Sequence, residues 1–382
     1  MRRPDGPGLL MVGFEGKSLP SRLARQIREG TVCGVVLFSR NVEAPRQVRD
    51  LCREIRAAAG RGRPAPLVAI DQEGGRVTRL AAAGFTPFPP ARCYSLFCCR
   101  ASRVACAVGE TMAEELRAVG VDINFAPVLD VDSNPENPVI GDRALSSNPE
   151  SVAELGIAFF RGTLSRGVLP VGKHFPGHGH TAADSHEVLP VVRSSRATLL
   201  ARDLHPFRRA IRAGIPALMT AHVLFPALDR EFPASLSKKI LGGLLRMQLR
   251  FRGAVVSDAL EMKAITGRFG IGAAAVRAVS AGCDIVLVCR GEKDQEEAGE
   301  AIARAWADDR DFRKIAGAST RRVSRLREHL SRVVGGPPPA RRGSLRQVGT
   351  RRHRELSRLL FDHWESSGQA SRAGRSGNIG EG

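Results

Sequence analysis

The chain has 382 residues, enough for two domains or for one large α/β barrel with a tail. Apolar residues make up 43% and charged residues 25%, which excludes wholesale disorder and a disulfide-stapled miniprotein. No apolar run approaches the roughly 18 residues that span a bilayer, so we expect a cytoplasmic protein without membrane contact.

The net charge of +19 raises the question of an acidic partner such as nucleic acid. Residues 331–382 hold ten Arg against four Asp or Glu, so part of the charge lies in a short C-terminal stretch. One Tyr and two Trp offer little for base stacking, and no obligate nucleic-acid partner is expected. The eight cysteines lack the spacing of a zinc site and are expected to be free thiols.

Eight short apolar runs recur along the chain without polar alternation, as is typical of parallel strands buried on both faces. They lie at residues 9–14, 35–38, 67–70, 123–129, 169–172, 217–220, 254–257 and 285–289. Segments with helical patterning lie between and after them, at residues 45–58, 102–119, 149–166, 198–213, 237–249, 271–281, 294–307 and 315–333. This alternation predicts an α/β fold of one domain, a (β/α)8 TIM barrel.

The barrel is expected to occupy residues 1–334 as the catalytic domain. Residues 335–382 are rich in Pro, Gly and Arg and are predicted to form a linker and a basic tail, whose end, from Ser366, is expected to be disordered. Within this tail, residues 353–364 have the pattern of a short amphipathic helix.

Charged side chains end or follow five of the eight predicted strands. Catalytic groups of a TIM barrel lie at the C-terminal ends of its strands, so these residues are candidates for the site. They are Asp71, Asp130, Asp132, Lys173, His174, His222 and Asp258.

The segment from Lys173 to His186 carries four His, one Lys and one Asp within a Gly-containing loop. It fits a zinc site, or a Schiff-base lysine at a strand end. It also fits a loop in which Asp184 orients His186 as a general acid and base. The alternative is a purely structural loop, whose histidines form hydrogen bonds only with the backbone.

Two further segments offer carboxylates. Asp258 ends a buried strand and can be a nucleophile in glycosyl transfer, or else cap the following helix. Asp71 can accept hydrogen bonds from sugar hydroxyls, and Arg76 and Arg79 bring planar guanidinium groups. Asp130 and Asp132 are expected to order the loop that leads to Arg143 rather than to react.

Six motifs follow one another along the chain. They are Asp71-Gln-Glu-Gly-Gly-Arg76, Asn124-Phe-Ala-Pro-Val-Leu-Asp130, Gly141-Asp-Arg143, Lys173-His-Phe-Pro-Gly-His-Gly179, Asp184-Ser-His186 and Ser257-Asp-Ala-Leu-Glu-Met262. In this collinear order they resemble glycoside hydrolase family 3, and within it the bacterial β-N-acetylglucosaminidases of peptidoglycan recycling. The resemblance extends from about residue 8 to residue 330.

The resemblance implies a retaining exo-β-N-acetylglucosaminidase, a β-hexosaminidase that releases terminal GlcNAc from GlcNAc–1,6-anhydro-N-acetylmuramic acid, with or without peptide. It implies Asp258 as the nucleophile and His186, assisted by Asp184, as the acid and base. The residues that it implies for sugar binding are Asp71, Arg79, Arg143, Lys173 and His174. It implies no cofactor and no metal, and we expect a monomer.

A retaining glycosidase usually pairs its nucleophile with a second carboxyl group. No glutamate in these segments is expected to take that place, whereas the imidazole of a His–Asp dyad titrates near neutrality and can. Other readings of the chain are a phosphorylase or β-glucosidase on the same site, a metal-dependent hydrolase, and a basic nucleic-acid-binding protein. The sequence departs from the resemblance at His180, where a small or acidic residue is expected.

Overall fold

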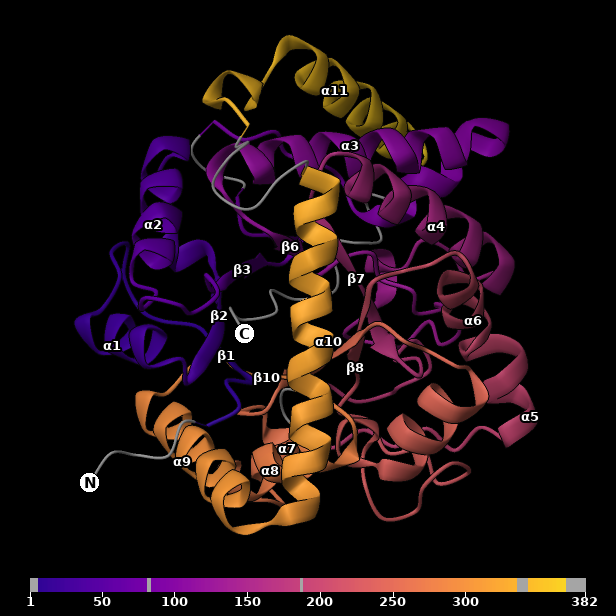
Figure 1. Ribbon diagram of the computed structural model, residues 1–382. Helices are drawn as coiled ribbons and strands as arrows, with labels where there is room; N and C mark the ends of the chain where they lie inside the picture. Colours follow the sequence, from indigo (N-terminus) through magenta and orange to yellow (C-terminus); the bar gives the residue numbers. More distant parts are fainter. Residues whose placement is uncertain (1–5, 81–83, 186–187, 335–342, 369–382) are drawn as a thin grey trace.

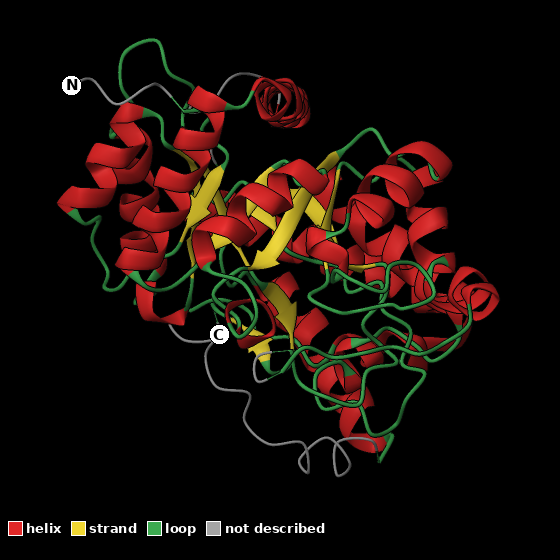
Figure 2. Ribbon diagram, turned by 90° about the horizontal axis from the view of Figure 1, so that it is seen from below, coloured by secondary structure: helices red, strands yellow, loops and turns green. Residues whose placement is uncertain are grey.

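The computed structural model describes residues 6–80, 84–185, 188–334 and 343–368. Eight parallel strands close into a barrel in the order β1-β10-β9-β8-β7-β6-β3-β2, with helices around it (Figure 1). Figure 2 shows the strands enclosed by helices when the molecule is seen from below. The predicted (β/α)8 barrel is therefore confirmed.

The strands of the barrel are short and almost wholly buried, which explains why the sequence shows no polar alternation. They are β1 (Leu10–Val12), β2 (Val32–Leu37), β3 (Leu67–Ile70), β6 (Ile123–Asn124), β7 (Leu169–Phe175), β8 (Ala217–Thr220), β9 (Ala254–Ala259) and β10 (Ile285–Val288). The predicted fourth strand, residues 123–129, is regular only at its start. Pro127 donates no ladder hydrogen bond, and Val128 makes an isolated bridge to Lys173.

Most predicted helices are present, and their bounds differ by a few residues. The main α-helices are α1 (Ser21–Glu29), α2 (Pro45–Ala57), α3 (Ala101–Val119), α4 (Pro149–Ser165), α6 (His205–Arg212), α8 (Ile271–Ala281), α9 (Glu292–Asp308) and α10 (Arg310–Val334). The other helical pieces are α5 (Arg196–Thr198), α7 (Lys263–Thr266), η1 (Ser39–Asn41), η2 (Ala91–Arg100), η3 (Gly141–Arg143), η4 (Leu199–Asp203), η5 (Ala234–Leu236) and η6 (Lys239–Gln248).

The single helix predicted over residues 198–213 is divided into α5, η4 and α6. Pro206 lies in the first turn of α6, where its missing N–H group is tolerated, so the helix restarts there. In the described parts of the chain, no helix is long and apolar enough to span a membrane. All eight cysteines are free thiols, as predicted.

A small hairpin leaves the barrel after β3 and consists of β4 (Gln72–Gly74) and β5 (Val77–Thr78). Gly74 and Gly75 have positive φ values of 100° and 57°, which lets the chain turn between these strands. A Cβ atom on Gly74 would come within 2.6 Å of the Pro89 carbonyl oxygen. The hairpin therefore packs tightly against the chain that follows it.

The C-terminal segment, residues 343–368, contains η7 (Leu345–Gln347) and α11 (Arg351–Ser366). The helix predicted at residues 353–364 is thus confirmed, and it lies along α3 (Figure 1). Leu360 and Trp364 are buried among side chains of η2 and α3.

α11 is ordered because its apolar face packs on a complementary surface of η2 and α3. The disorder expected from Ser366 concerns mainly residues 369–382 and stays a prediction. Residues 335–342 and 369–382 lie outside the described residues. The predicted domain boundary between residues 334 and 335 stays a prediction.

His353 attaches α11 to α3. Its ring nitrogens lie 2.9 Å from Glu115 Oε1 and 2.9 Å from Glu114 Oε2. Burial alone would lower the pKa of His353, but the hydrogen bonds to these two carboxylates outweigh it and raise the pKa above 6.5.

A raised folded-state pKa means that this contribution to stability is complete below the unfolded pKa and is lost as the pH rises through the folded value. We expect the melting temperature of the wild type to fall by about 2 °C more than that of His353→Gln between about pH 6 and about pH 9. Thermal unfolding at both pH values measures this. Equal falls in the two proteins would contradict the prediction.

Candidate active site

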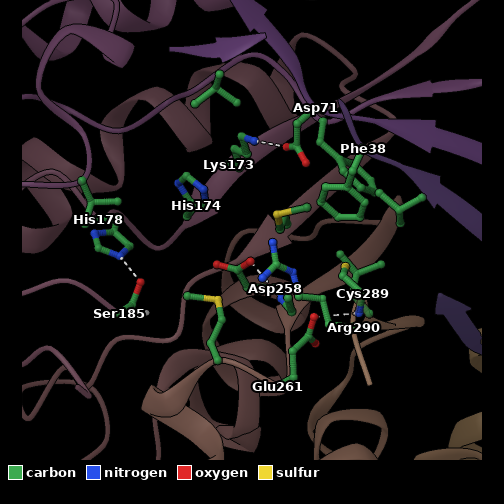
Figure 3. A pocket seen from close by; sticks show the side chains of 18 of the residues that line it. Phe38, Asp71, Lys173, His174, His178, Ser185, Asp258, Glu261, Cys289 and Arg290 are labelled. Carbon is green, nitrogen blue, oxygen red and sulfur yellow. Dashed lines mark hydrogen bonds and ion pairs between the residues drawn. The ribbon is translucent and has the colours of Figure 1, made fainter. Parts of the chain in front are cut away.

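A cavity of about 320 Å³ opens at the C-terminal ends of the barrel strands (Figure 3). Six of the residues predicted for the site line it together: Asp71, Arg79, Arg143, Lys173, His174 and Asp258. They come from the chain after β3, from β7, from β9 and from the loop after β6. The residues that the strand-end rule of barrels singled out thus line one cavity together.

Lys173 lies at the centre of a buried charge network. Its Nζ is 2.5 Å from Asp71 Oδ1 and 2.6 Å from Glu73 Oε1. Arg143 holds the same Glu73 through two parallel hydrogen bonds of 2.9 Å each. Two cations and two carboxylates thus alternate in one network, in which Asp71, Lys173 and Arg143 line the cavity and Glu73 lies buried between the two cations.

The network fixes the charge states of its members. Burial alone would lower the pKa of Lys173, but the carboxylates of Asp71 and Glu73 outweigh it and raise the pKa. Burial would likewise raise the pKa of Glu73, yet Arg143 and Lys173 bring it well below its usual range. Lys173 is therefore a protonated cation at neutral pH, which argues against a Schiff-base lysine that must attack as a neutral amine.

His174 is oriented by Asp130. The Nδ1 atom of His174 lies 2.7 Å from Asp130 Oδ2, so its Nε2 edge points away from this carboxylate. Asp130 also accepts the backbone N–H groups of His174 and His178. Burial would raise the pKa of Asp130, but the neighbouring His174 lowers it overall. Asp130 thus orders the loop after β7, whereas the sequence predicted that it would order the loop leading to Arg143.

The other histidines of this loop are engaged with hydroxyl groups. His178 has its Nε2 3.1 Å from Ser185 Oγ and its Nδ1 3.0 Å from Thr181 Oγ1. Burial, with the charge of His174, lowers the pKa of His178 to about 4, so its ring is neutral. His180 bonds to Ser133 Oγ at 3.1 Å and is not among the residues that line the cavity.

The zinc reading finds no support in the part of the chain that the structure describes. No three His, Cys, Asp or Glu side chains of that part are grouped so that they could hold a metal ion. His174 and His178 instead have their hydrogen bonds with Asp130 and Ser185.

The predicted acid and base is placed only in part. Asp184 is half-buried beside the cavity and not among its lining residues, and its charge acts on Arg76. His186 lies outside the described residues. Ser185, between them, lines the cavity, and its carbonyl oxygen accepts the N–H of Ala264 at 3.3 Å. The loop therefore reaches the chain that follows β9.

Asp258 lies at the end of β9, across the cavity from Lys173 and Asp71 (Figure 3). Its Oδ1 accepts the N–H of Ala259 at 2.9 Å. The helix cap suggested as its alternative role is wrong, because α7 begins at Lys263 and its N-cap residue is Met262. The carboxylate of Asp258 belongs to the cavity.

Glu261 was missed by sequence reasoning, which expected no glutamate in such a place. It lines the cavity, and its Oε1 accepts the N–H of Cys289 at 2.8 Å. Its Oε2 is buried and meets no hydrogen-bond partner among the described residues. Burial raises the pKa of Glu261 to about 7. Glu261 lies in a turn after β9, where the sequence has no strand or helix periodicity, so the sequence could not predict that its side chain points toward the cavity.

The two arginines of the hairpin differ in their roles. Arg76 donates to the carbonyl oxygens of Val139 and Ile140 at 2.7 and 3.1 Å, so it holds the loop after β6. Arg79 instead lies over the ring of Phe38, with its guanidinium carbon 5.6 Å from the ring centre. Both arginines line the cavity, and Arg79 is the one that lies beside the Phe38 ring rather than holding the loop after β6.

Comparisons with known proteins agree with this geometry. Residues 7–314 match the N-terminal domain of glycosyl hydrolase family 3. A protein named Beta-hexosaminidase from Thiobacillus denitrificans is 42% identical over 306 residues, which cover 79% of this chain and 82% of that protein. Another of the same name, from Alkalilimnicola ehrlichii, is 40% identical over 347 residues, covering 87% and 97%.

Solved structures give the same result. A family 3 beta-N-acetylglucosaminidase from Paenibacillus superposes with a TM-score of 0.87 and 37% identity, over 95% of this chain and 68% of that one. NagZ from Neisseria gonorrhoeae, in complex with N-trifluoroacetyl-D-glucosamine, does so with a TM-score of 0.71 and 34% identity, over 85% and 98%. The barrel with its cavity between Lys173 and Asp258 thus belongs to a glycoside hydrolase, and the chain is a member of glycosyl hydrolase family 3.

Proposed function

We propose that the chain is a retaining exo-β-N-acetylglucosaminidase. Its substrate would be GlcNAc β-linked to 1,6-anhydro-N-acetylmuramic acid, with or without peptide, in cytoplasmic cell-wall recycling. The observation that carries this proposal is the Asp258 carboxylate, which faces Asp71 and Lys173 across one cavity. The relatives named Beta-hexosaminidase and the Neisseria structure with a glucosamine derivative support the sugar.

The size of the cavity favours removal of a single terminal sugar. Its volume of about 320 Å³ is at the small end of the roughly 300–1,000 Å³ that ligand pockets span. Asp71 and Lys173 would bond to hydroxyl groups of the sugar, and the Nε2 edge of His174 would add a further polar contact. A cavity of this size suits an exo-acting enzyme.

In the first step Asp258 attacks the anomeric carbon. The C1–O bond of the leaving group breaks as the Asp258–C1 bond forms, and the configuration at C1 inverts. His186 gives its proton to the leaving oxygen, and Asp184 stabilises the imidazolium. The product of this step is a glycosyl-aspartate and a free alcohol.

In the second step water attacks C1 and displaces Asp258. His186, now neutral, takes a proton from that water as its oxygen bonds to C1. The second inversion restores the β configuration, and both Asp258 and His186 return to their starting charges. The cycle needs no cofactor.

His186 is a better proton donor for this proposal than Glu261, although Glu261 has a pKa of about 7. The Oε1 atom of Glu261 is occupied by the N–H of Cys289. Its Oε2 is shielded from the cavity, so a leaving oxygen could not reach it. Ser185, the neighbour of His186, lines the cavity.

The experiment that tests the proposal is turnover of p-nitrophenyl β-N-acetylglucosaminide beside the β-glucoside, with and without EDTA and phosphate. Cleavage of the GlcNAc substrate alone, unaffected by either addition, is expected. Acceleration by phosphate with release of a sugar phosphate would make the enzyme a phosphorylase. Cleavage of the glucoside at a similar rate would remove the specificity, and no cleavage at all would contradict the proposal.

His186→Ala is expected to lose little activity on aryl glycosides with good leaving groups and much more on poor ones, because only poor leaving groups need protonation. Comparing kcat/KM along a series of leaving groups measures this. Glu261→Gln is the matched control and should show no such dependence. A dependence in Glu261→Gln and none in His186→Ala would assign the acid to Glu261 instead.

A further inference from the structure

The C-terminal segment, residues 343–368, contacts a loop that comes directly before η2. This loop, residues 84–90, is called here the bracing loop. Ser357 Oγ donates to the Pro87 carbonyl oxygen at 2.6 Å. A Cβ atom on Gly349 would come within 2.5 Å of the Gly84 carbonyl oxygen, so the two backbones are in close contact. The C-terminal segment therefore lies directly on the bracing loop.

Glu115 of α3 connects the two segments from beneath. Its carboxylate accepts the backbone N–H and the hydroxyl of Thr86 in the bracing loop, at 2.9 and 2.6 Å. The same carboxylate accepts the N–H of Gly349 at 2.9 Å and pairs with His353 at 2.9 Å. Glu115 is buried, so loss of either partner leaves an acceptor away from water.

The bracing loop in turn holds the hairpin β4–β5. Gly75 N–H donates to the Phe88 carbonyl oxygen at 2.8 Å. Cβ atoms on Gly74 and Gly75 would clash with Pro89 and Pro90, at 2.6 and 2.8 Å. An isolated two-stranded hairpin is marginally stable in water, so this hairpin depends on the loop for its position.

The hairpin supplies much of one wall of the active site. Asp71 precedes it, Glu73 lies in it, and Arg79 follows it. Apolar packing continues the connection, because Phe88 of the bracing loop shares a buried cluster with Leu360 and Trp364 of α11. The Paenibacillus enzyme superposes on 95% of this chain, and because α10 ends at Val334, the superposed part includes residues C-terminal to α10.

We propose that the C-terminal segment positions the sugar-binding hairpin through the bracing loop, with His353 and Ser357 as positioning residues. Neither residue lines the cavity. They act on affinity for the sugar by holding Asp71 and Arg79 where they can bind it. The inference rests on the proposed function only for the substrate with which affinity is measured.

The test uses the full-length chain with Ser357→Ala and with His353→Gln/Ser357→Ala. For p-nitrophenyl β-N-acetylglucosaminide we expect KM to rise about fivefold in the single variant and more in the double, with kcat changed less than about twofold. Asp71 and Arg79 bind the sugar in the ground state and the transition state alike, so their displacement weakens binding uniformly. If the double variant does not fold, the KM of Ser357→Ala alone tests the proposal.

Two controls separate positioning from general stability. Leu359→Ala changes an exposed side chain on the same helix and should leave KM unchanged. Leu330→Ala removes a buried side chain of α10 and should lower the melting temperature without raising KM. An unchanged KM in the Ser357 variants, or an equal rise in Leu330→Ala, would overturn the proposal.

Hydrogen exchange gives a readout that needs no activity. Backbone amides of residues 72–80 should exchange faster in the Ser357 variants than in the wild type. In Leu359→Ala their exchange rates should equal those of the wild type. A wild type that cleaves no GlcNAc substrate would contradict the proposed function, while the exchange of the hairpin still tests its positioning. Equal exchange in all variants would contradict the positioning.

Discussion

Asp258→Ala is expected to lose about 10⁴-fold in kcat while the barrel stays folded. The carboxylate is the proposed nucleophile, and among the residues that the structure describes no other carboxylate on its side of the cavity can replace it. Glu261, its neighbour there, has one oxygen bonded to Cys289 and the other shielded. Asp258 is half-buried at a strand end, so its truncation leaves the packing of the barrel core in place.

Azide is the reagent that separates loss of the nucleophile from loss of the site. A small anion can enter the space that Asp258→Ala vacates and attack C1 from the same face. The expected product is the α-glycosyl azide, formed at a rate that rises with azide concentration and is identified by NMR. The wild type should give only the β-configured sugar.

Asp132→Asn is a control for loss of a carboxylate outside the cavity. Asp132 pairs with Arg92 at 2.6 Å and is not among the lining residues, so the variant should show no rescue by azide. A folded Asp258→Ala with full activity would remove Asp258 from the mechanism. A β-glycosyl azide would mean that the anion enters from the other face.

The sequence predicted the residues whose position follows from chain direction. In a parallel barrel every strand ends on the same face, so a charged residue at a strand end is placed without knowledge of packing. Asp71, Lys173, His174 and Asp258 are of this kind, and they do share one cavity. Chain direction could not predict the ion-pair partners of these residues. The contact of Lys173 with Glu73, for example, depends on the path of the hairpin β4–β5 outside the barrel.

The C-terminal segment shows where composition misleads. The ten arginines of residues 331–382 and the Pro run that precedes the segment suggested a linker and a tail, although the pattern of α11 was visible. Whether such a helix docks depends on a complementary surface, and η2 with α3 supplies it far away in the sequence. For His186 the sequence offered a motif and a resemblance, and its role remains a prediction.

Lys173→Met is expected to impair both stability and activity, because Lys173 is the buried cation between two carboxylates. Removing one partner of a buried ion pair costs about 3–5 kcal/mol, and here Arg143 alone is left to compensate two carboxylates, Asp71 and Glu73. Urea unfolding followed by tryptophan fluorescence measures the change in free energy. KM should rise as well, because Asp71 loses the contact that orients it.

Glu73→Gln tests whether the cost comes from the pair itself. If Lys173 stabilises the protein mainly through Glu73, the double variant should be less destabilised than the sum of the single ones, with a coupling of about 1–3 kcal/mol. Lys173→Arg should not restore the wild type, because a planar guanidinium group cannot lie between Asp71 and Glu73 as a compact ammonium does. Additive effects would contradict this origin.

The pH dependence of the Lys173→Met defect follows from Glu73. Its pKa lies below the ordinary 4.5 in the folded protein, so its contribution to stability is present above pH 4.5 and is lost as the pH falls through the folded value. Lys173→Met removes one of the charges that lower this pKa. The stability difference between wild type and variant should therefore be largest near neutral pH and shrink in acid. A difference that grows as the pH falls would show that Lys173 does not act through the ionised carboxylate.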